Sequence, residues 1–202
     1  METKKILAPM IAAIVTLVMI TVGATYAYFT VTATSNFGTK TITATTPDLG
    51  SVALSGGSSL YLNLSRVNMM SANKGTYYAV TSSNGVATTT ASETTIATAT
   101  VTGAGTFSCD YTLNIAYDGT LKAALKKDGV AILKVNNTDY DIYSTTFPKT
   151  VTGSLTGLVA GTNKTITASL RFVNANEEQN ELINKSMTLT FTTTAFTCTA
   201  TA

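Results

Sequence analysis

The side chains that carry most enzymatic chemistry are sparse in this chain of 202 residues, and histidine is absent. Without an imidazole, the chain cannot assemble a Ser-His-Asp triad or a Cys-His pair for nucleophilic catalysis. Zinc sites that use histidine, including the HExxH helix, are excluded for the same reason. We therefore expect that the protein is not an enzyme and that it needs no cofactor and no metal ion.

Two other patterns suggest chemistry but are explained by local structure. Glu177, Glu178 and Glu181 lie close together, as an acid pair or a metal site requires. The first turn of a helix also attracts acidic residues, because of the helix dipole. Gly56 and Gly57 form a glycine pair that is too short and too isolated for a phosphate-binding loop, and a turn explains it. Neither pattern predicts a site.

The two cysteines, Cys109 and Cys198, each lie in a strand-like context. In both, an aromatic residue two positions earlier, Phe107 or Phe196, shares the face of the cysteine. An even number of cysteines in an oxidising compartment favours pairing. A Cys109–Cys198 disulfide would close a loop of roughly 90 residues and stabilise the fold by about 4 kcal/mol in the chain-entropy model. In a reducing setting the alternative is two buried free thiols.

The N-terminal segment has the anatomy of a secretory signal. Lys4 and Lys5 form a short basic region, residues 6–22 are apolar apart from two threonines, and small residues follow. We expect residues 1–27 to be a signal peptide that a signal peptidase cuts between Ala27 and Tyr28 during export. The protein would then act in the extracellular matrix or at the cell surface, and would meet the membrane only as a precursor.

The alternative is a retained transmembrane anchor. The apolar run of about 17 residues is at the lower limit for a bilayer core of roughly 30 Å. Pro9 lies inside the run and no basic cluster follows it, which favours cleavage.

Composition indicates a neutral, β-rich protein. Charged residues make up 12% of the chain and the formal net charge is +2, so no basic stripe predicts binding to nucleic acid. Threonine accounts for about a fifth of the chain. Because threonine is β-branched and keeps a hydroxyl on the wet face of a sheet, this usage favours strands.

Alternating apolar and polar residues set out the expected strands. They cover residues 28–34, 39–45, 60–64, 76–81, 94–102, 106–117, 131–135, 140–143, 150–155, 165–173 and 186–199. Short helices are expected at 120–127 and 176–184, from their spacing and capping residues. Many short strands separated by turns predict an all-β fold, a two-sheet jelly-roll-like sandwich, with residues 28–202 as one domain.

The last strand changes phase along its length. Met187, Leu189 and Phe191 share one face, whereas Phe196 and Cys198 follow the other phase. A strand of period two cannot change face without an extra residue. We therefore predict a β-bulge near residues 192–195.

Two stretches resemble one family. They are Gly23-Ala24-Thr25-Tyr26-Ala27-Tyr28-Phe29-Thr30 at the signal end, and Glu178-Gln179-Asn180 followed by Lys185-Ser186-Met187-Thr188-Leu189-Thr190-Phe191-Thr192. Both are similar to the secreted TasA/camelysin-like proteins of Gram-positive bacteria. The resemblance implies a jelly-roll subunit, released by a dedicated signal peptidase, that forms extracellular fibres of the biofilm matrix by donor-strand addition. Some members carry a metallopeptidase label, which a chain without histidine does not support.

The chemistry of the expected donor strand agrees with this role. The strand consists of Tyr28, Phe29, Thr30, Val31, Thr32, Ala33 and Thr34. It alternates, contains no proline and carries no charge, which makes an exposed edge a liability in a monomer. In a head-to-tail polymer of identical chains the same edge would be the joint, because a free strand can complete the sheet of a neighbour.

Two alternatives to the fibre subunit stay open. One is a monomeric adhesin or binding module that uses Tyr77, Tyr78, Tyr140 and Tyr143, although tyrosines of this kind often line the rim of a sandwich core. The other is a pilin that retains its N-terminal apolar helix in the filament.

N-terminal sequencing of secreted protein distinguishes these possibilities. We expect Tyr28 as the first residue, because the small residues before it fit a signal peptidase site. A mature chain that begins near Ile6 would instead support the pilin and would rule out a free donor strand.

Overall fold

The computed structural model describes residues 29–32, 40–46, 49–70, 74–83, 85–174 and 179–201. The expected signal peptide 1–27 and its cleavage point at Ala27 and Tyr28 lie outside the described residues. So do Ala33 and Thr34 of the expected donor strand.

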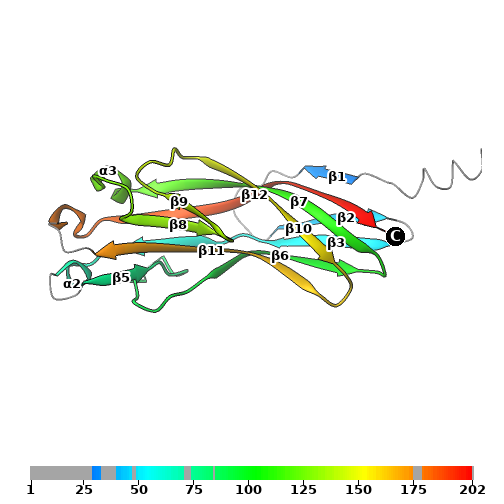
Figure 1. The fold of residues 1–202 in the computed structure, drawn as a ribbon, viewed down its shortest axis with the longest axis horizontal. Helices are drawn as coiled ribbons and strands as arrows, with labels where there is room; N and C mark the ends of the chain where they lie inside the picture. The colour runs from blue at the N-terminus through cyan, green and yellow to red at the C-terminus, as the bar shows by residue number, and fades with distance from the viewer. Residues whose placement is uncertain are drawn as a thin grey trace, which may run out of the picture.

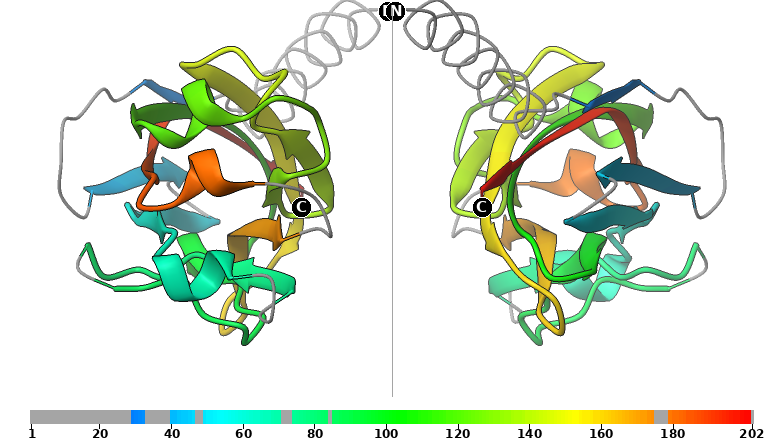
Figure 2. Two further views of the ribbon diagram at one scale, coloured as in Figure 1. Left: turned by 90° about the vertical axis from the view of Figure 1, so that its left-hand side faces the viewer. Right: turned by 90° about the vertical axis from the view of Figure 1, so that its right-hand side faces the viewer.

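The strands form two antiparallel sheets (Figures 1 and 2). Sheet A has the order β1-β12-β7-β10, with β4 also on β12, and sheet B has the order β2-β3-β6-β11-β8-β9, with β5 also on β11. Their bounds are β1 Phe29–Thr32, β2 Lys40–Thr46, β3 Gly50–Gly56, β4 Ser59–Asn63, β5 Gly75–Tyr78, β6 Thr94–Thr102, β7 Thr106–Gly119, β8 Ala131–Val135, β9 Thr138–Asp141, β10 Lys149–Leu158, β11 Asn163–Asn174 and β12 Ser186–Thr201.

Most connections cross from one sheet to the other, so that neighbours within a sheet are usually distant in sequence. The chain passes between the sheets after β1, β3, β4, β6, β7, β9, β10 and β11. This confirms the predicted all-β, jelly-roll-like sandwich. The end-on views show the two sheets curling around a shared interior (Figure 2).

The helices are short and lie in connections at one end of the sandwich (Figure 1). They are α2, Arg66–Met69, α3, Leu121–Ala124, and the 3-10 turn η2, Asn180–Leu182. Ser65 caps α2, because its hydroxyl accepts a hydrogen bond from the backbone N–H of Asn68 at 3.3 Å. The helix predicted over 120–127 is present but shorter than expected, since α3 covers Leu121–Ala124. Within the described part of 176–184, the structure has only the 3-10 turn η2 in place of the predicted helix.

β7 and β12 run through the middle of sheet A and show the predicted alternation. Five residues of β7 are buried at alternate positions, and Ser108, Asp110, Thr112 and Asn114 between them are more exposed: the buried ones are Phe107, Cys109, Tyr111, Leu113 and Ile115. The predicted bulge in β12 is confirmed, since the register with β7 shifts between Thr193 and Ala195. The extra residue lets both halves of β12 keep their apolar side chains on the inner face.

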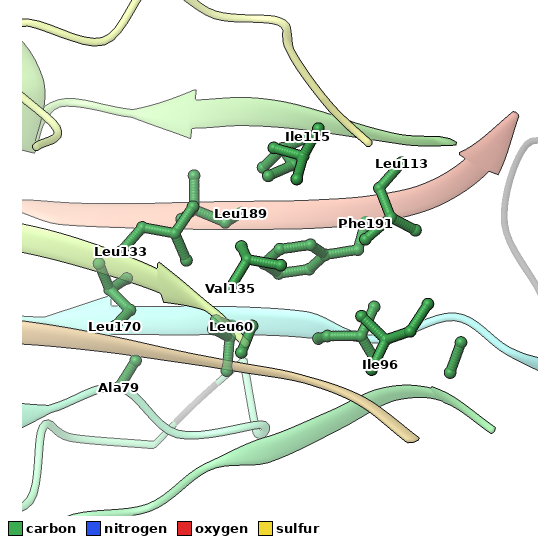
Figure 3. Packing of buried hydrophobic residues seen from close by; sticks show 14 of the residues in the cluster. Leu60, Ala79, Ile96, Leu113, Ile115, Leu133, Val135, Leu170, Leu189 and Phe191 are labelled. Atoms are coloured by element: carbon green, nitrogen blue, oxygen red, sulfur yellow. The ribbon is translucent and has the colours of Figure 1, made fainter. Parts of the chain in front are cut away.

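Side chains from both sheets meet in one hydrophobic core. Figure 3 shows Phe191 of β12 and Val135 of β8 reaching into the space between the sheets, among leucines and isoleucines of other strands. Leu60 of β4 and Leu170 of β11, which are 1% exposed each, close this interior from the two sheets.

Strand β3 was not predicted, because its alternation is short and lies beside a glycine pair. Val52 and Leu54 alternate with the small residues Ser51, Ala53 and Ser55, and are buried at 0% and 2% exposure. Gly56 belongs to the end of this strand and not to a free turn. A Cβ atom on Gly56 would lie 2.4 Å from the carbonyl oxygen of Ile96, so the close approach of β6 requires glycine there.

A polar link joins the two sheets inside the sandwich. The hydroxyl of Tyr111, on β7, accepts a hydrogen bond from the side-chain amide of Asn136 at 2.8 Å. Asn136 lies in the turn between β8 and β9, with a positive φ of 49°. Its side-chain oxygen accepts from the backbone N–H of Thr167 at 2.9 Å. Because Tyr111 is 4% exposed, its hydroxyl depends on this link in place of water.

The structure leads us to expect that Tyr111→Phe lowers the free energy of unfolding by roughly 1–2 kcal/mol at neutral pH, because Asn136 loses a buried partner. Burial raises the pKa of Tyr111, and the hydrogen bond from Asn136 opposes this only in part. A raised folded-state pKa contributes stability that is present below pH ~10 and is lost as the pH rises through that pKa. Urea unfolding from pH 7 to 11 should show a shallower decline in the variant.

Tyr143→Phe is the matched control, since this side chain is 44% exposed. It should leave the free energy of unfolding within a few tenths of a kcal/mol of the wild type. Equal stability of Tyr111→Phe and wild type at pH 7 would show that the inter-sheet link contributes nothing.

Candidate assembly site

The first described strand, β1, lies at the end of sheet A. It pairs antiparallel with the second half of β12, from Phe29 opposite Cys198 to Thr32 opposite Ala195. Among the described residues β1 has no other strand partner, and β2 lies near it at the neighbouring edge of sheet B (Figure 2). Four of the seven residues of the expected donor strand, Phe29–Thr32, therefore form a strand, and they do so on their own chain.

Two strands share the outer edge of β12. β4 pairs with residues 186–190, and β1 pairs with residues 195–198. The bulge at Thr194 lies between these two segments, where its hydroxyl donates to the carbonyl of Thr112 at 3.3 Å. A bulge generally bends a strand and increases its local twist. β1 and β4 therefore pair with separate segments of β12.

The inner edge of the same segment is held by β7. Cys198 lies directly opposite Cys109, and a disulfide joins the predicted pair, with a Cα–Cα distance of 4.0 Å. Both cysteines are buried, at 3% and 1% exposure. Cys198 therefore lies between a covalent partner on β7 and the backbone of Phe29 on β1.

The two edges of β12 differ greatly in strength. The ladder to β7 extends from Met187 to Thr201 and includes the disulfide. The ladder to β1 has 4 residues, and such a ladder holds roughly four backbone hydrogen bonds worth ~0.5–1.5 kcal/mol each. Pairing of this strength can open without global unfolding. The backbone pairing of β1 is therefore much shorter than the pairing of β7 at the opposite edge of β12.

No charged residue occurs in β1 or β12. On the neighbouring strand β7, the acidic residue Asp110 lies opposite Thr197 of β12. Its carboxylate accepts a hydrogen bond from the hydroxyl of Ser154 at 2.5 Å. Backbone pairing and side-chain pattern, not ion pairs, therefore set the register of this edge.

The other candidate residues do not gather into a site. Glu181 forms an ion pair with Lys126 on the surface, and Glu177 and Glu178 lie outside the described residues. Within the described ranges, the structure has no group of three His, Cys, Asp or Glu side chains that could hold a metal ion.

The tyrosines proposed for a binding face also separate. Tyr77 is 5% exposed and belongs to the core, whereas Tyr143 is 44% exposed on the connection between β9 and β10. Tyr78 and Tyr140 are half-buried. The four residues therefore do not form one exposed surface. None of the helices within the described residues is long and apolar enough to span a bilayer.

No family model, no curated protein and no solved structure matches this chain. The fold defines an all-β sandwich whose N-terminal strand occupies a short edge position. The resemblance to the TasA/camelysin-like family stays a prediction.

The disulfide generates a direct test. Replacing both cysteines, as Cys109→Ala/Cys198→Ala, should lower the free energy of unfolding by roughly 2–4 kcal/mol, because the unfolded chain loses a long cross-link. Urea unfolding with and without reductant provides the control, since the reductant should shift the wild type but not the variant. If the reductant does not change the urea unfolding curve of the wild type, the disulfide is absent.

Proposed function

We propose that the mature chain is a structural subunit of an extracellular fibre, in which β1 of one copy pairs with β12 of the next. The observation that supports this most directly is the short, uncharged ladder between β1, Phe29–Thr32, and the edge of β12. Export and cleavage between Ala27 and Tyr28 would free this strand. The partner in this proposal is a second copy of the same chain.

The cis pairing of β1 refines the mechanism. In the single chain β1 completes its own sheet, so assembly requires that a neighbour's β1 replaces the resident one. The exchanged strand can form the same backbone pairs from Cys198 to Ala195, because hydrogen bonds of a ladder do not depend on which copy supplies the strand. The exchange therefore keeps the number of backbone hydrogen bonds between β1 and β12 unchanged. A high concentration of the protein would then favour the polymer by mass action.

In this proposal the exchange runs head to tail and builds an open polymer. A strand donated by one copy and accepted by a different surface of the next is a heterologous contact, which forms fibres when its rotation does not close. After the proposed cut between Ala27 and Tyr28, β1 would be joined to the body of its own subunit only through the segment between Thr32 in sheet A and Lys40 in sheet B.

A mixture of two single-cysteine variants tests this exchange. Thr32 and Ala195 are opposite each other, so Thr32→Cys and Ala195→Cys are placed in separate chains that keep the native disulfide. A disulfide between the two variants then forms only where β1 of one copy lies on β12 of another. We expect fibres by negative-stain microscopy and a covalent heterodimer on a non-reducing gel.

Two controls make the result specific. Thr152→Cys on β10, at the opposite edge of sheet A, should give no heterodimer with Thr32→Cys. Adding Thr30→Pro and Val31→Pro to the Thr32→Cys chain removes backbone donors from β1 and should abolish the heterodimer. If fibres form without the heterodimer, strand exchange is rejected but the fibre role is not. If the processed protein stays monomeric at high concentration, the fibre role itself is rejected.

A further inference from the structure

A groove outside the assembly site lies beneath the connection between β9 and β10. β10 begins with Lys149 opposite Ile115, but β7 continues to Gly119, and the chain that leads into β10 spans this gap. The connection, residues 142–148, arches over the end of the sandwich that carries α3 (Figure 1). We call it the arch.

Two adjoining hollows lie at the arch. One has a volume of about 670 Å³ and the other about 410 Å³. Tyr117, Lys122 and Tyr143 line both of them, so these three side chains stand at the boundary between the hollows. The combined space is large enough for one or two sugar rings or a molecule of similar size.

The start of the arch is held in place by hydrogen bonds. The carboxylate of Asp141 accepts the backbone N–H of Tyr143 at 2.9 Å and also that of Gly129. The carbonyl of Asp141 accepts the N–H of Thr145 at 2.9 Å, and Ile142 donates to Ala131 at the same distance. The groove is therefore formed before any ligand arrives, which lowers the entropic cost of binding.

Lys122 places a positive charge in the groove. Its ammonium donates to the carbonyls of Ile142 at 2.8 Å and Tyr143 at 2.6 Å. An ammonium has three N–H donors, so one remains for another acceptor. Within the described part of the chain no carboxylate forms an ion pair with Lys122. The charge is thus fixed in position and still available to an anion.

Aromatic faces and polar groups surround this charge. The ring of Tyr117 lies 5.4 Å from that of Phe147, centroid to centroid, and its hydroxyl accepts the backbone N–H of Lys122 at 2.8 Å. Tyr143 is 44% exposed. The remaining lining includes the hydroxyls of Ser144, Thr145 and Thr146 and the amide of Asn114.

We propose that the arch groove binds a saccharide that carries an anionic group, a carboxylate or a phosphate. The sugar ring would pack against the exposed aromatic face of Tyr143, and the anion would accept the free N–H of Lys122. An apolar ligand would leave the hydroxyls and the amide of the groove without partners, which is costly. A ring with many hydroxyls satisfies them. This site needs only one folded copy and does not depend on the fibre proposal.

Matched small probes test the proposal by NMR titration of the mature chain. Glucuronate and glucose 6-phosphate carry both ring and anion, glucose carries the ring alone, and inorganic phosphate carries the anion alone. We expect at least one of the first two to bind about tenfold more tightly than either partial probe. The backbone shifts should be confined to residues 117–122 and 142–148. Which acidic probe binds better identifies the anionic group.

Two variants separate the contributions of ring and charge. Tyr143→Ala should weaken binding of the acidic probes about tenfold, whereas Lys122→Gln should remove the preference over glucose but can still donate to the arch carbonyls. Lys164→Gln, exposed on β11 at the opposite end of the sandwich, is the charge control and should bind as wild type. If Lys122→Gln changes the NMR resonances of the arch in the absence of ligand, the test rests on the affinity of Tyr143→Ala for the acidic probes.

Three outcomes would overturn the proposal. The acidic sugars could bind no more tightly than glucose or phosphate, the shifts could fall outside the arch, or Tyr143→Ala could bind as wild type. Each would show that the groove does not recognise a ring and an anion together.

Discussion

The pairing of β7 with β12 is the interaction on which the rest of this structure depends. It extends over nearly the whole of both strands and is joined covalently at Cys109 and Cys198. The inner faces of these strands supply Phe107, Leu113 and Phe191 to the core, while their outer edges receive β10 on one side and β4 and β1 on the other. Removing this pair would leave the other strands of sheet A without a neighbour.

The long ladder between β7 and β12 contrasts with the short ladder between β12 and β1. β7 and the disulfide hold β12 along one edge, and β1 pairs with the other edge over residues 195–198. The bulge at Thr194 belongs to the same arrangement, because it corrects the phase of the apolar residues and also separates the place of β4 from that of β1. One extra residue thus serves both the core and the proposed joint.

Unequal strand lengths at the other edge produce the arch groove. β7 continues past the start of β10, and the connection that bridges the difference is tied down through Asp141 and Lys122. Tyr111 plays a related part inside the sandwich, where it joins β7 to the turn at Asn136. In both places a polar side chain secures a connection that apolar packing alone does not position.

The sequence by itself determined the all-β class, the alternation of β7 and the bulge in β12, because each follows from the period of two. It favoured the cysteine pair but left two free thiols open, and the structure has the disulfide. It did not show β3, whose five central residues give too short an alternation beside a glycine pair. Only the tertiary structure decided that Phe29–Thr32 pairs with its own β12, and that Tyr117, Lys122 and Tyr143 share a groove. The pairing of β1 with β12 and the contact of Lys122 with Tyr143 join different segments of the chain, and local patterns carry no information about which distant edge a strand or side chain will meet.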